Sequence, residues 1–330
     1  MTGQEEEAQM SRRRRFVPAA RLLVVGAAAL LLAACSGAAV ATPTPQAADP
    51  STDKLAQILA RGTLVAYGTT DYAPQSFVVD GAVRPAGTKC LPNQRTGPEL
   101  SGFDAETSKV LAKGLGVEVC FVDMHWTQLT SGHWGDNIDI AYGSGAINAE
   151  RMPDLWMTQP YAYSPQRFVV RSDSSYQKPS DLDGKRIGIC TGCTVESYLK
   201  GTLQIPGVDL VQKVTDPVLV GYEFEAPGLD ALAAGETDAY LSAEQVAVDA
   251  IKRGMPLRML DEPAFGMYLT GFVDKASGLD EAAFVARVND IIDAAHADGT
   301  LKALSMQWFG ADYTTPAAAF DISKLGQQIQ

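Results

Sequence analysis

The sequence has few cationic residues, and it contains neither a long hydrophobic run nor a nucleotide-binding loop. Twenty-seven Lys and Arg residues stand against 39 Asp and Glu residues, for a formal net charge of −12. The sequence shows no stripe of basic residues that could follow a phosphate backbone, which argues against nucleic acid as a partner. The apolar run at residues 22–34 is shorter than the roughly 20 residues of a membrane-spanning helix. The pattern G-x-x-x-x-G-K-[ST] does not occur, which excludes a P-loop ATPase.

Histidine is also scarce, with three in the chain. His125 and His133 lie eight residues apart. His125 directly precedes segment 126–137, which is expected to be a loop, and His133 lies within it. Two histidines at this spacing can suggest a metal, but no third ligand follows at a useful distance. We therefore expect surface or core roles for both side chains, and neither a metal nor a cofactor.

Residues 1–35 have the pattern of an export signal and are set aside from the fold. A basic segment, Ser11–Phe16, precedes the apolar run, and small residues lead into Cys35. This resembles a bacterial lipoprotein signal, so Cys35 is expected to carry the lipid anchor. A plain secretory signal with a chance cysteine is the alternative. The arginines before Phe16 also loosely resemble a twin-arginine export signal.

Residues 36–52 are small and polar and include prolines, without the hydrophobic periodicity that burial requires. They are expected to form a flexible tether between the lipid and the folded body. An anchored lipid, a tether and a folded body together predict an extracytoplasmic protein held at the cell membrane, on its periplasmic or outer face.

Five cysteines are present, and four remain once Cys35 is assigned to lipid. In an oxidising compartment an even number favours two disulfides, for which three connectivities are open. We prefer Cys90–Cys120 with Cys190–Cys193, because these pairs fall in different halves of the chain. A redox centre at Cys190 and Cys193 and a four-cysteine zinc site are the alternatives.

Strand and helix patterns alternate through the rest of the chain, which predicts an α/β fold. Strands are expected at residues 64–68, 117–122, 186–190 and 239–241, and helices at 53–61, 104–115, from about 195, and at 228–234, 280–297 and 300–310. Asp104 is expected to cap the second of these helices.

The segment from Asp139 to Tyr161 is expected to hold a small carboxylate. It reads as a short buried strand, a Gly-Ser-Gly turn and a helical turn that carries Arg151. The glycines let the backbone approach a ligand, and the guanidinium presents a planar fork to two oxygens.

A second candidate is the connection between the strand at 186–190 and the helix that follows it. Free backbone N–H groups at a helix start attract anions, and the hydroxyl of Thr194 can add a donor. A routine connection with Thr194 as the helix cap is the alternative. The aromatic-rich loop 71–81 also follows a strand, where ligands sit in open α/β sheets.

Seven short motifs occur in an order that resembles the family 3 bacterial extracellular solute-binding proteins, the polar-amino-acid-binding components of ABC importers. They are RGTLVAYGTTDYAPQSF, SGFDAETSKVLAKGLGV, D-x-x-x-G-S-x-x-I-x-x-E-R, QPY, DLDGKRIGICTGCT, ALAAGETDAYL and DGTLKALSMQWFG. The resemblance extends from about Asp53 to Gly310.

The resemblance implies a two-lobed type II periplasmic-binding-protein fold with two hinge strands. Lobe 1 would comprise residues 53–164 and 267–330, lobe 2 residues 165–266, with crossings near 162–166 and 262–267. A solute would bind in the cleft, the lobes would close over it, and the monomer would dock on a permease that is a separate chain.

The resemblance also implies roles for individual residues. Arg151 matches the arginine that clamps the ligand carboxylate, and Thr194 a threonine that donates to the same group. Further expected contacts are Ser144 and the backbone at Ala146 near the ligand head, Asp71 and Tyr72 near its side chain, and Cys193, at a position that is commonly Thr or Ser.

One position departs from the family pattern. Ala243 occupies the place where an aspartate usually pairs with the ligand ammonium. Burying an ammonium without a carboxylate would cost several kcal/mol. Either another acid substitutes, with Glu244, Asp71 and Glu223 as candidates, or the ligand is not a standard α-amino acid.

The sequence thus predicts a lipoprotein that captures a small, polar, carboxylated and amino-acid-like solute for an ABC importer. No dyad or triad has a spacing that demands catalysis, so we expect no enzyme. A cyclohexadienyl-type dehydratase on the same scaffold and a ligand-sensing subunit of a membrane receptor are the alternatives.

Overall fold

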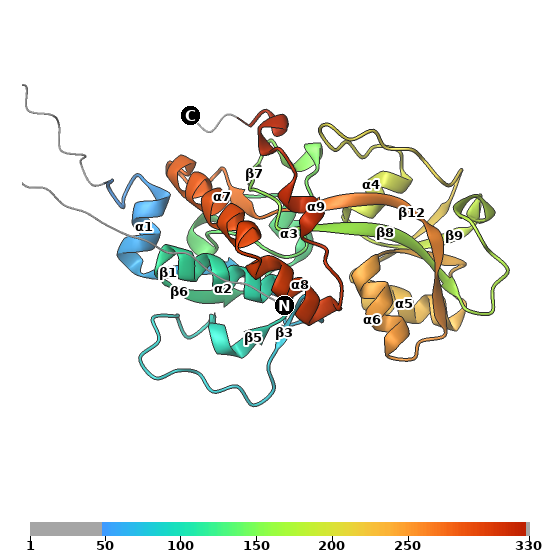
Figure 1. Ribbon diagram of the computed structural model, residues 1–330, viewed down its shortest axis with the longest axis horizontal. Helices are drawn as coiled ribbons and strands as arrows, with labels where there is room; N and C mark the ends of the chain where they lie inside the picture. The colour runs from blue at the N-terminus through green and yellow to red at the C-terminus, as the bar shows by residue number, and fades with distance from the viewer. Residues whose placement is uncertain (1–47, 328–330) are drawn as a thin grey trace, which may run out of the picture. The chain divides into compact units, whose positions relative to one another are not determined.

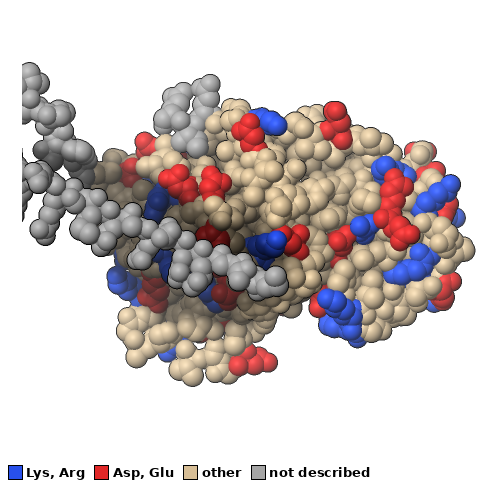
Figure 2. Space-filling model, viewed as in Figure 1, with Lys and Arg blue, Asp and Glu red and all other residues tan. Residues whose placement is uncertain are grey.

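The computed structural model describes residues 48–327 (Figure 1). Cys35, the rest of the expected signal and tether residues 36–47 lie outside the described residues, so the lipid anchor stays a prediction. Within residues 48–327, no helix combines the length and the apolar character needed to cross a membrane. On the face shown in Figure 2, cationic and anionic side chains are interspersed.

The first part of the described chain is built on a three-stranded sheet in the order β1-β6-β4. Strands β1 (Thr63–Tyr67) and β6 (Glu118–Val122) run parallel, and the short β4 (Arg95–Thr96) pairs antiparallel with β6. All five residues of β1 are buried, as expected for a strand covered on both faces. The helices that pack with this sheet and with one another are α1 (Lys54–Arg61), α2 (Phe103–Leu115), α7 (Ala282–Ala297) and α8 (Thr300–Phe309).

Local signals explain where these helices begin and end. The Asp53 side chain accepts a hydrogen bond from Ala56 N and caps α1, which stops at Gly62 with a left-handed φ of 73°. The prediction that Asp104 caps α2 is wrong. The cap residue is Gly102, and Asp104 lies in the first turn with its carboxylate bonded to other side chains.

A five-stranded sheet in the order β10-β9-β11-β8-β12 forms the second part. Its strands are β8 (Ala162–Arg171), β9 (Arg186–Cys190), β10 (Val218–Tyr222), β11 (Ala239–Ala243) and β12 (Leu257–Leu269). Strands β9, β10 and β11 are parallel, while β11–β8 and β8–β12 are antiparallel. The helices between these strands are α4 (Thr194–Leu199), α5 (Glu225–Ala234) and α6 (Glu244–Lys252).

Two long strands, β8 and β12, run side by side (Figure 1). They pair from Leu257 and Arg171 at one end to Leu269 and Ala162 at the other, with register shifts between Met259 and Phe265. The expected crossings at 162–166 and 262–267 fall within this pair. At its far end, Leu269 forms a bridge to Ala146 of the Gly-Ser-Gly segment. The strand pair therefore connects the five-stranded sheet to the region around β1.

The remaining elements are short. They are β2 (Asp71–Tyr72), β3 (Ser76–Val78) and β5 (Leu100–Ser101) in one small sheet, β7 (Leu155–Met157) and β13 (Phe272–Asp274) in another, α3 (Trp126–Thr130), α9 (Thr315–Ala318), and the 3-10 turns η1 (Gly97–Glu99), η2 (Gly135–Asn137), η3 (Ala149–Arg151), η4 (Pro179–Leu182) and η5 (Ile322–Leu325). Segment 126–137, expected as a loop, thus contains two helical turns.

A buried ion cluster ties the start of the described chain to the Asp139 segment. Asp139 is almost fully buried and pairs with Lys54 at 2.8 Å and with Arg61. Its Oδ2 also accepts a hydrogen bond from Val65 N at 2.8 Å. Buried charges need such complete pairing, so Asp139 fixes the segment against β1 rather than contacting a ligand.

Both disulfides have the connectivity that we preferred. Cys90–Cys120 joins the Pro- and Gly-rich segment before β4 to strand β6, with a Cα–Cα distance of 5.4 Å. Cys190–Cys193 spans the turn between β9 and α4. The four cysteines are therefore bonded to one another and are not arranged as a zinc site.

Candidate functional site

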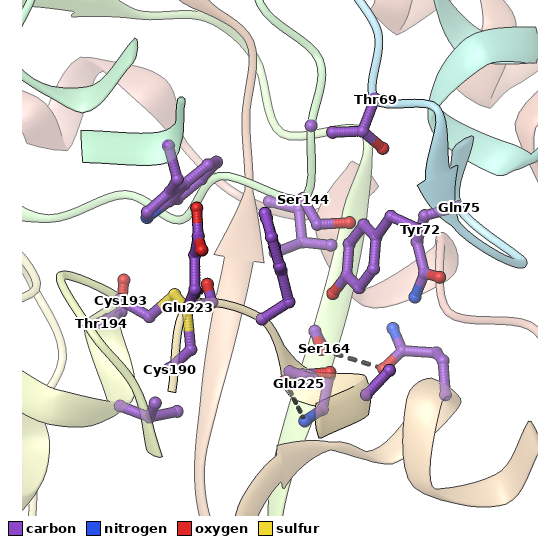
Figure 3. A pocket seen from close by; sticks show the side chains of 18 of the residues that line it. Thr69, Tyr72, Gln75, Ser144, Ser164, Cys190, Cys193, Thr194, Glu223 and Glu225 are labelled. Atoms are coloured by element: carbon purple, nitrogen blue, oxygen red, sulfur yellow. Dashed lines mark hydrogen bonds between the residues drawn. A yellow bond between two sulfur atoms is a disulfide. The ribbon is translucent and has the colours of Figure 1, made fainter. Parts of the chain in front are cut away.

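A cavity of about 390 Å³ lies where the two sheets' connecting loops meet (Figure 3). This volume is in the range of small-molecule sites. Residues of β1 and its following loop, of the Gly-Ser-Gly turn, of β8, of the β9–α4 turn and of the β10–α5 connection all contribute to its wall. Segments far apart in sequence therefore converge on one cavity.

The structure brings five of the eight expected contact residues to this wall. Asp71, Tyr72, Ser144, Cys193 and Thr194 line the cavity. The other three, Ala146, Arg151 and Glu244, do not form part of the lining.

Arg151 lies behind the wall and joins two segments of it. Its Nη1 donates to Ala146 O and its Nη2 to Gly192 O, both at 3.3 Å. The guanidinium also lies over the rings of Trp126 and Phe272, at 5.4 and 5.7 Å from their centroids. Burial lowers the pKa of Arg151 to about 10. A buried cation held by two neutral carbonyls can still accept an anion as a partner.

The β9–α4 turn places Thr194 and the disulfide on the cavity wall. Gly192 has a left-handed φ of 73°, and its N–H donates to Glu196 Oε2 at 2.6 Å. Helix α4 begins at Thr194, which is buried, one residue earlier than expected. Its cap position is Cys193, so the alternative with Thr194 as the cap residue is wrong.

Ser144 is held by a buried carboxyl group. Its backbone has a left-handed φ of 56°, and its Oγ donates to Asp104 Oδ2 at 2.8 Å. Tyr161 OH donates to Asp104 Oδ1 at 2.7 Å. Burial raises the pKa of Asp104 to about 6, while the bonds from Tyr161 and Ser144 oppose that rise. Asp104 thereby fixes the shape of the Gly-Ser-Gly turn.

Glu244 points away from the cavity, contrary to its expected role. Its Oε1 accepts a hydrogen bond from Tyr313 OH at 2.9 Å, and its Oε2 pairs with Arg167. Strand β11 ends at Ala243 and helix α6 begins at Glu244, so successive side chains leave the backbone in different directions. Ala243 faces the cavity, and its neighbour does not.

Glu225 and Asp230 are acids of the cavity lining that the sequence did not indicate, and Glu225 is the one with a buried carboxyl group. It is the first residue of α5, and its Oε1 accepts a hydrogen bond from Ala243 N at 3.3 Å. Burial raises the pKa of Glu225 to about 7, while the Ala243 N–H and the Ser242 hydroxyl lower it. Glu223, an acid expected from the sequence, also lines the cavity, but its side chain is 64% exposed and lies 3.4 Å from His125 Nδ1.

Uncharged polar residues complete this side of the cavity. Gln166 Nε2 donates to Ser164 O at 3.2 Å and to Ser164 Oγ at 2.9 Å. Ser164 Oγ in turn donates to Gln245 Oε1 at 2.9 Å. Gln75 lies on the facing wall. An acid in the first turn of a helix after a strand was the available signal for Glu225, whereas single glutamines carry no sequence signal.

Within residues 48–327, no group of three or more His, Cys, Asp or Glu side chains is arranged to hold a metal ion. His133 lies 4.0 Å from Asp154, and both of these side chains are largely exposed. The polar groups at the cavity are hydrogen-bonding side chains, the Arg151 cation behind the wall and the carboxyl groups of Asp71, Glu223, Glu225 and Asp230.

Comparison with known proteins identifies relatives over most of the chain. The L-cystine-binding protein TcyJ of Escherichia coli (strain K12) is 28% identical over 262 residues, which cover 79% of this chain and 87% of that protein. The solved structure of the ancestral amino acid-binding protein AncCDT-1, a precursor of cyclohexadienyl dehydratase, superposes with a TM-score of 0.62 at 23% identity, covering 78% of this chain and 100% of that one. Tv2483 bound to L-arginine gives a TM-score of 0.65 at 18% identity, covering 82% and 99%.

These structural matches confirm the predicted α/β fold of the type II periplasmic-binding-protein class. Residues 76–311, well over half of the chain, match the family described as bacterial extracellular solute-binding proteins, family 3. The chain belongs to this family of bacterial extracellular solute-binding proteins.

Proposed function

We propose that this protein is the amino-acid-binding component of an ABC importer and captures a small carboxylated solute in the 390 Å³ cavity. The observation that carries the proposal is that the cavity is lined by residues from two different parts of the fold. Its residues come from both the β1 side and the five-stranded sheet, so movement of one sheet relative to the other would open and close the site. The relatives named for cystine and arginine binding support the same class of solute.

In this proposal, lobe 1 comprises residues 53–164 and 267–330, and lobe 2 comprises residues 165–266. The strand pair β8–β12 is the hinge between them. The protein acts outside the cytoplasm as a monomer anchored through a lipid on Cys35, and its closed form docks on a separate permease chain.

Arg151, Thr194 and Ser144 form the carboxylate end of the proposed site. The Arg151 guanidinium lies directly behind the β9–α4 turn, because its Nη2 donates to Gly192 O. A solute carboxylate at the turn would give the buried cation an anionic partner in place of a neutral carbonyl. The backbone at Ala146 supports this end by accepting from Arg151 Nη1.

The test is binding of L-arginine, L-glutamine and L-cystine by isothermal titration calorimetry and thermal shift. We expect the wild-type protein to bind at least one of them and Arg151→Ala to lose at least tenfold in affinity, since hydrogen bonds to charged groups contribute about 1.5–3 kcal/mol. Arg151→Lys keeps the buried charge and checks folding. Arg171→Ala removes an exposed arginine paired with Asp173 and should bind as wild type does.

Equal binding by Arg151→Ala and wild type would show that the carboxylate clamp is wrongly assigned. Absence of binding to every amino acid tested would remove the proposed function itself.

A cyclohexadienyl-type dehydratase is the second candidate, because Glu225 supplies a carboxyl group on the cavity wall with a pKa of about 7. Such chemistry needs a positioned proton donor. Turnover of prephenate or arogenate by the purified protein would favour this function over solute capture.

A further inference from the structure

Three side-chain oxygens on the cavity wall have no hydrogen-bond donor within residues 48–327. They are Glu225 Oε2, Gln166 Oε1 and Gln75 Oε1, and each atom is buried. The residues Gln166 and Gln75 are 1% and 3% exposed. Because an unsatisfied buried polar group costs about 1–3 kcal/mol, three such acceptors around one cavity indicate a ligand that donates hydrogen bonds.

The orientation of two of these groups is fixed by their neighbours. Gln166 Nε2 donates to the carbonyl oxygen of Ser164, which can only accept, so the amide cannot be turned around without losing this bond. The Gln166 Oε1 atom is therefore directed away from Ser164 O. The Glu225 carboxylate is held at Oε1 by the N–H of Ala243, which leaves Oε2 unpaired.

Among residues 48–327, no cationic side chain pairs with the Glu225 carboxylate. Burial raises the pKa of Glu225, and the Ala243 N–H and the nearby Ser242 hydroxyl, which donates to Ala243 O, lower it. An ionised carboxylate in this position would require a positive partner. The ring and hydroxyl of Tyr72 and the amide of Gln75 project toward the side where Ser164 and Glu225 lie (Figure 3).

The chemistry of a matching ligand group follows from these acceptors. A protonated amine is a compact cation with three N–H donors and no acceptor. It can satisfy a carboxylate oxygen and amide oxygens together, whereas a carboxylate, a hydroxyl or an apolar group cannot. The β11 position that faces this region is Ala243, whose side chain leaves room beside the Glu225 carboxylate.

We propose that Glu225, together with Gln166 and Gln75, forms the subsite that binds the protonated amino group of the solute. This inference rests on the proposed capture of an amino-acid-like solute. Glu225 supplies, from the start of α5, the carboxylate that the side chain at position 243 does not supply. The subsite selects solutes that carry an ammonium group over equally sized solutes that lack one.

The experiment measures calorimetric affinity at pH 8.0, where the Glu225 carboxyl group is ionised in the free protein because its pKa is about 7. Wild type, Glu225→Gln and the matched control Glu236→Gln are titrated with L-arginine, L-glutamine and L-cystine. Glu236 is exposed and outside the cavity lining, so its substitution makes the same charge change elsewhere. Whichever amino acid binds is then compared with its 2-hydroxy acid analogue, in which a hydroxyl replaces the amine.

We expect Glu225→Gln to weaken amino-acid binding by about 10- to 100-fold, as for loss of a charged hydrogen-bond partner, while Glu236→Gln binds like wild type. We also expect wild type and Glu225→Gln to bind the 2-hydroxy acid with equal affinity, because that ligand lacks the group that Glu225 recognises. This second comparison separates recognition of the amino group from a general effect on folding, which would weaken the binding of both ligands alike.

Equal amino-acid affinity of wild type and Glu225→Gln would overturn the inference and leave the proposed function intact. If Glu225→Gln lost the same factor in affinity for the amino acid and for its 2-hydroxy acid analogue, the inference would also be overturned, because Glu225 would then affect only the protein's structure. Failure of the wild-type protein to bind every amino acid tested would instead refute the proposed function, and the inference with it.

Discussion

The Glu225 carboxyl group should lower the stability of the ligand-free protein at neutral and alkaline pH. Burial raises its pKa from the ordinary 4.5 to about 7. A difference of roughly 2.5 between the folded and unfolded pKa corresponds to about 3 kcal/mol, at 1.36 kcal/mol per pKa unit. A carboxyl group whose pKa is raised by folding contributes most to stability below pH 4.5. That contribution is lost as the pH rises through 7.

Glu225→Gln removes this titration from the ligand-free protein. Relative to wild type, we expect little change in the free energy of unfolding at pH 4.5 and a gain of about 1–3 kcal/mol at pH 8. The lower end of this range allows for the cost of an unpaired buried amide at position 225 in the variant. The groups that face Glu225 and also titrate are the hydroxyls of Tyr72 and Tyr240, whose pKa values burial raises further above 10, so they do not contribute between pH 4.5 and 8.

Urea denaturation at several pH values between 4.5 and 8 measures this difference directly. Glu236→Gln serves as the control for the loss of one negative charge on the surface, and it should follow wild type throughout. A stability difference between Glu225→Gln and wild type that does not change with pH would refute the assignment of a buried, titrating carboxyl group. Glu225→Gln is thus expected to be more stable than wild type without ligand and to bind the amino acid more weakly.

A buried ion pair and a disulfide provide two further tests of how the fold positions the site. Asp139→Asn leaves Lys54 buried without its charge partner and should cost about 3–5 kcal/mol in urea denaturation, whereas Asp173→Asn, at an exposed ion pair, should cost less than 1 kcal/mol. A loss at Asp139 no larger than at Asp173 would contradict the buried ion cluster. Replacing Cys90 and Cys120 by Ala should cost about 2–4 kcal/mol, since the disulfide closes a loop of sequence separation 30. Equal unfolding midpoints for this variant and wild type would show that the loop is not constrained by the bond.

Hydrophobic and turn patterns predicted the larger elements correctly because those signals are local. The helix at 280–297 was expected from its apolar face, and the structure has α7 at Ala282–Ala297. Gly62 and Gly235 end their helices in the left-handed conformation that glycine adopts without strain. Short helical turns such as α3 were missed, since five residues are too few for a periodic pattern to be visible.

The site was predicted less completely than the fold. Thr194 was expected from its place at the end of a strand and from the family resemblance, and Ser144 from the resemblance; both line the cavity. Asp104 was assigned to a helix cap from its position in sequence, but the chain folds so that Tyr161 and Ser144 donate to it. A polar residue at a helix start can serve either role, and only the approach of other segments decides between them.

The sequence by itself determined the α/β alternation, the turn that carries Thr194 and the absence of an acid at position 243, while it left three disulfide connectivities open, among which the structure has the preferred one. Only the tertiary structure decided which acid lies beside position 243. Glu244 is adjacent in sequence but leaves the backbone toward Arg167 and Tyr313. Glu225 is eighteen residues earlier, yet the sheet brings the start of α5 beside the end of β11, within 3.3 Å of Ala243 N. Side-chain direction and strand order set that contact, and neither is encoded by spacing along the chain.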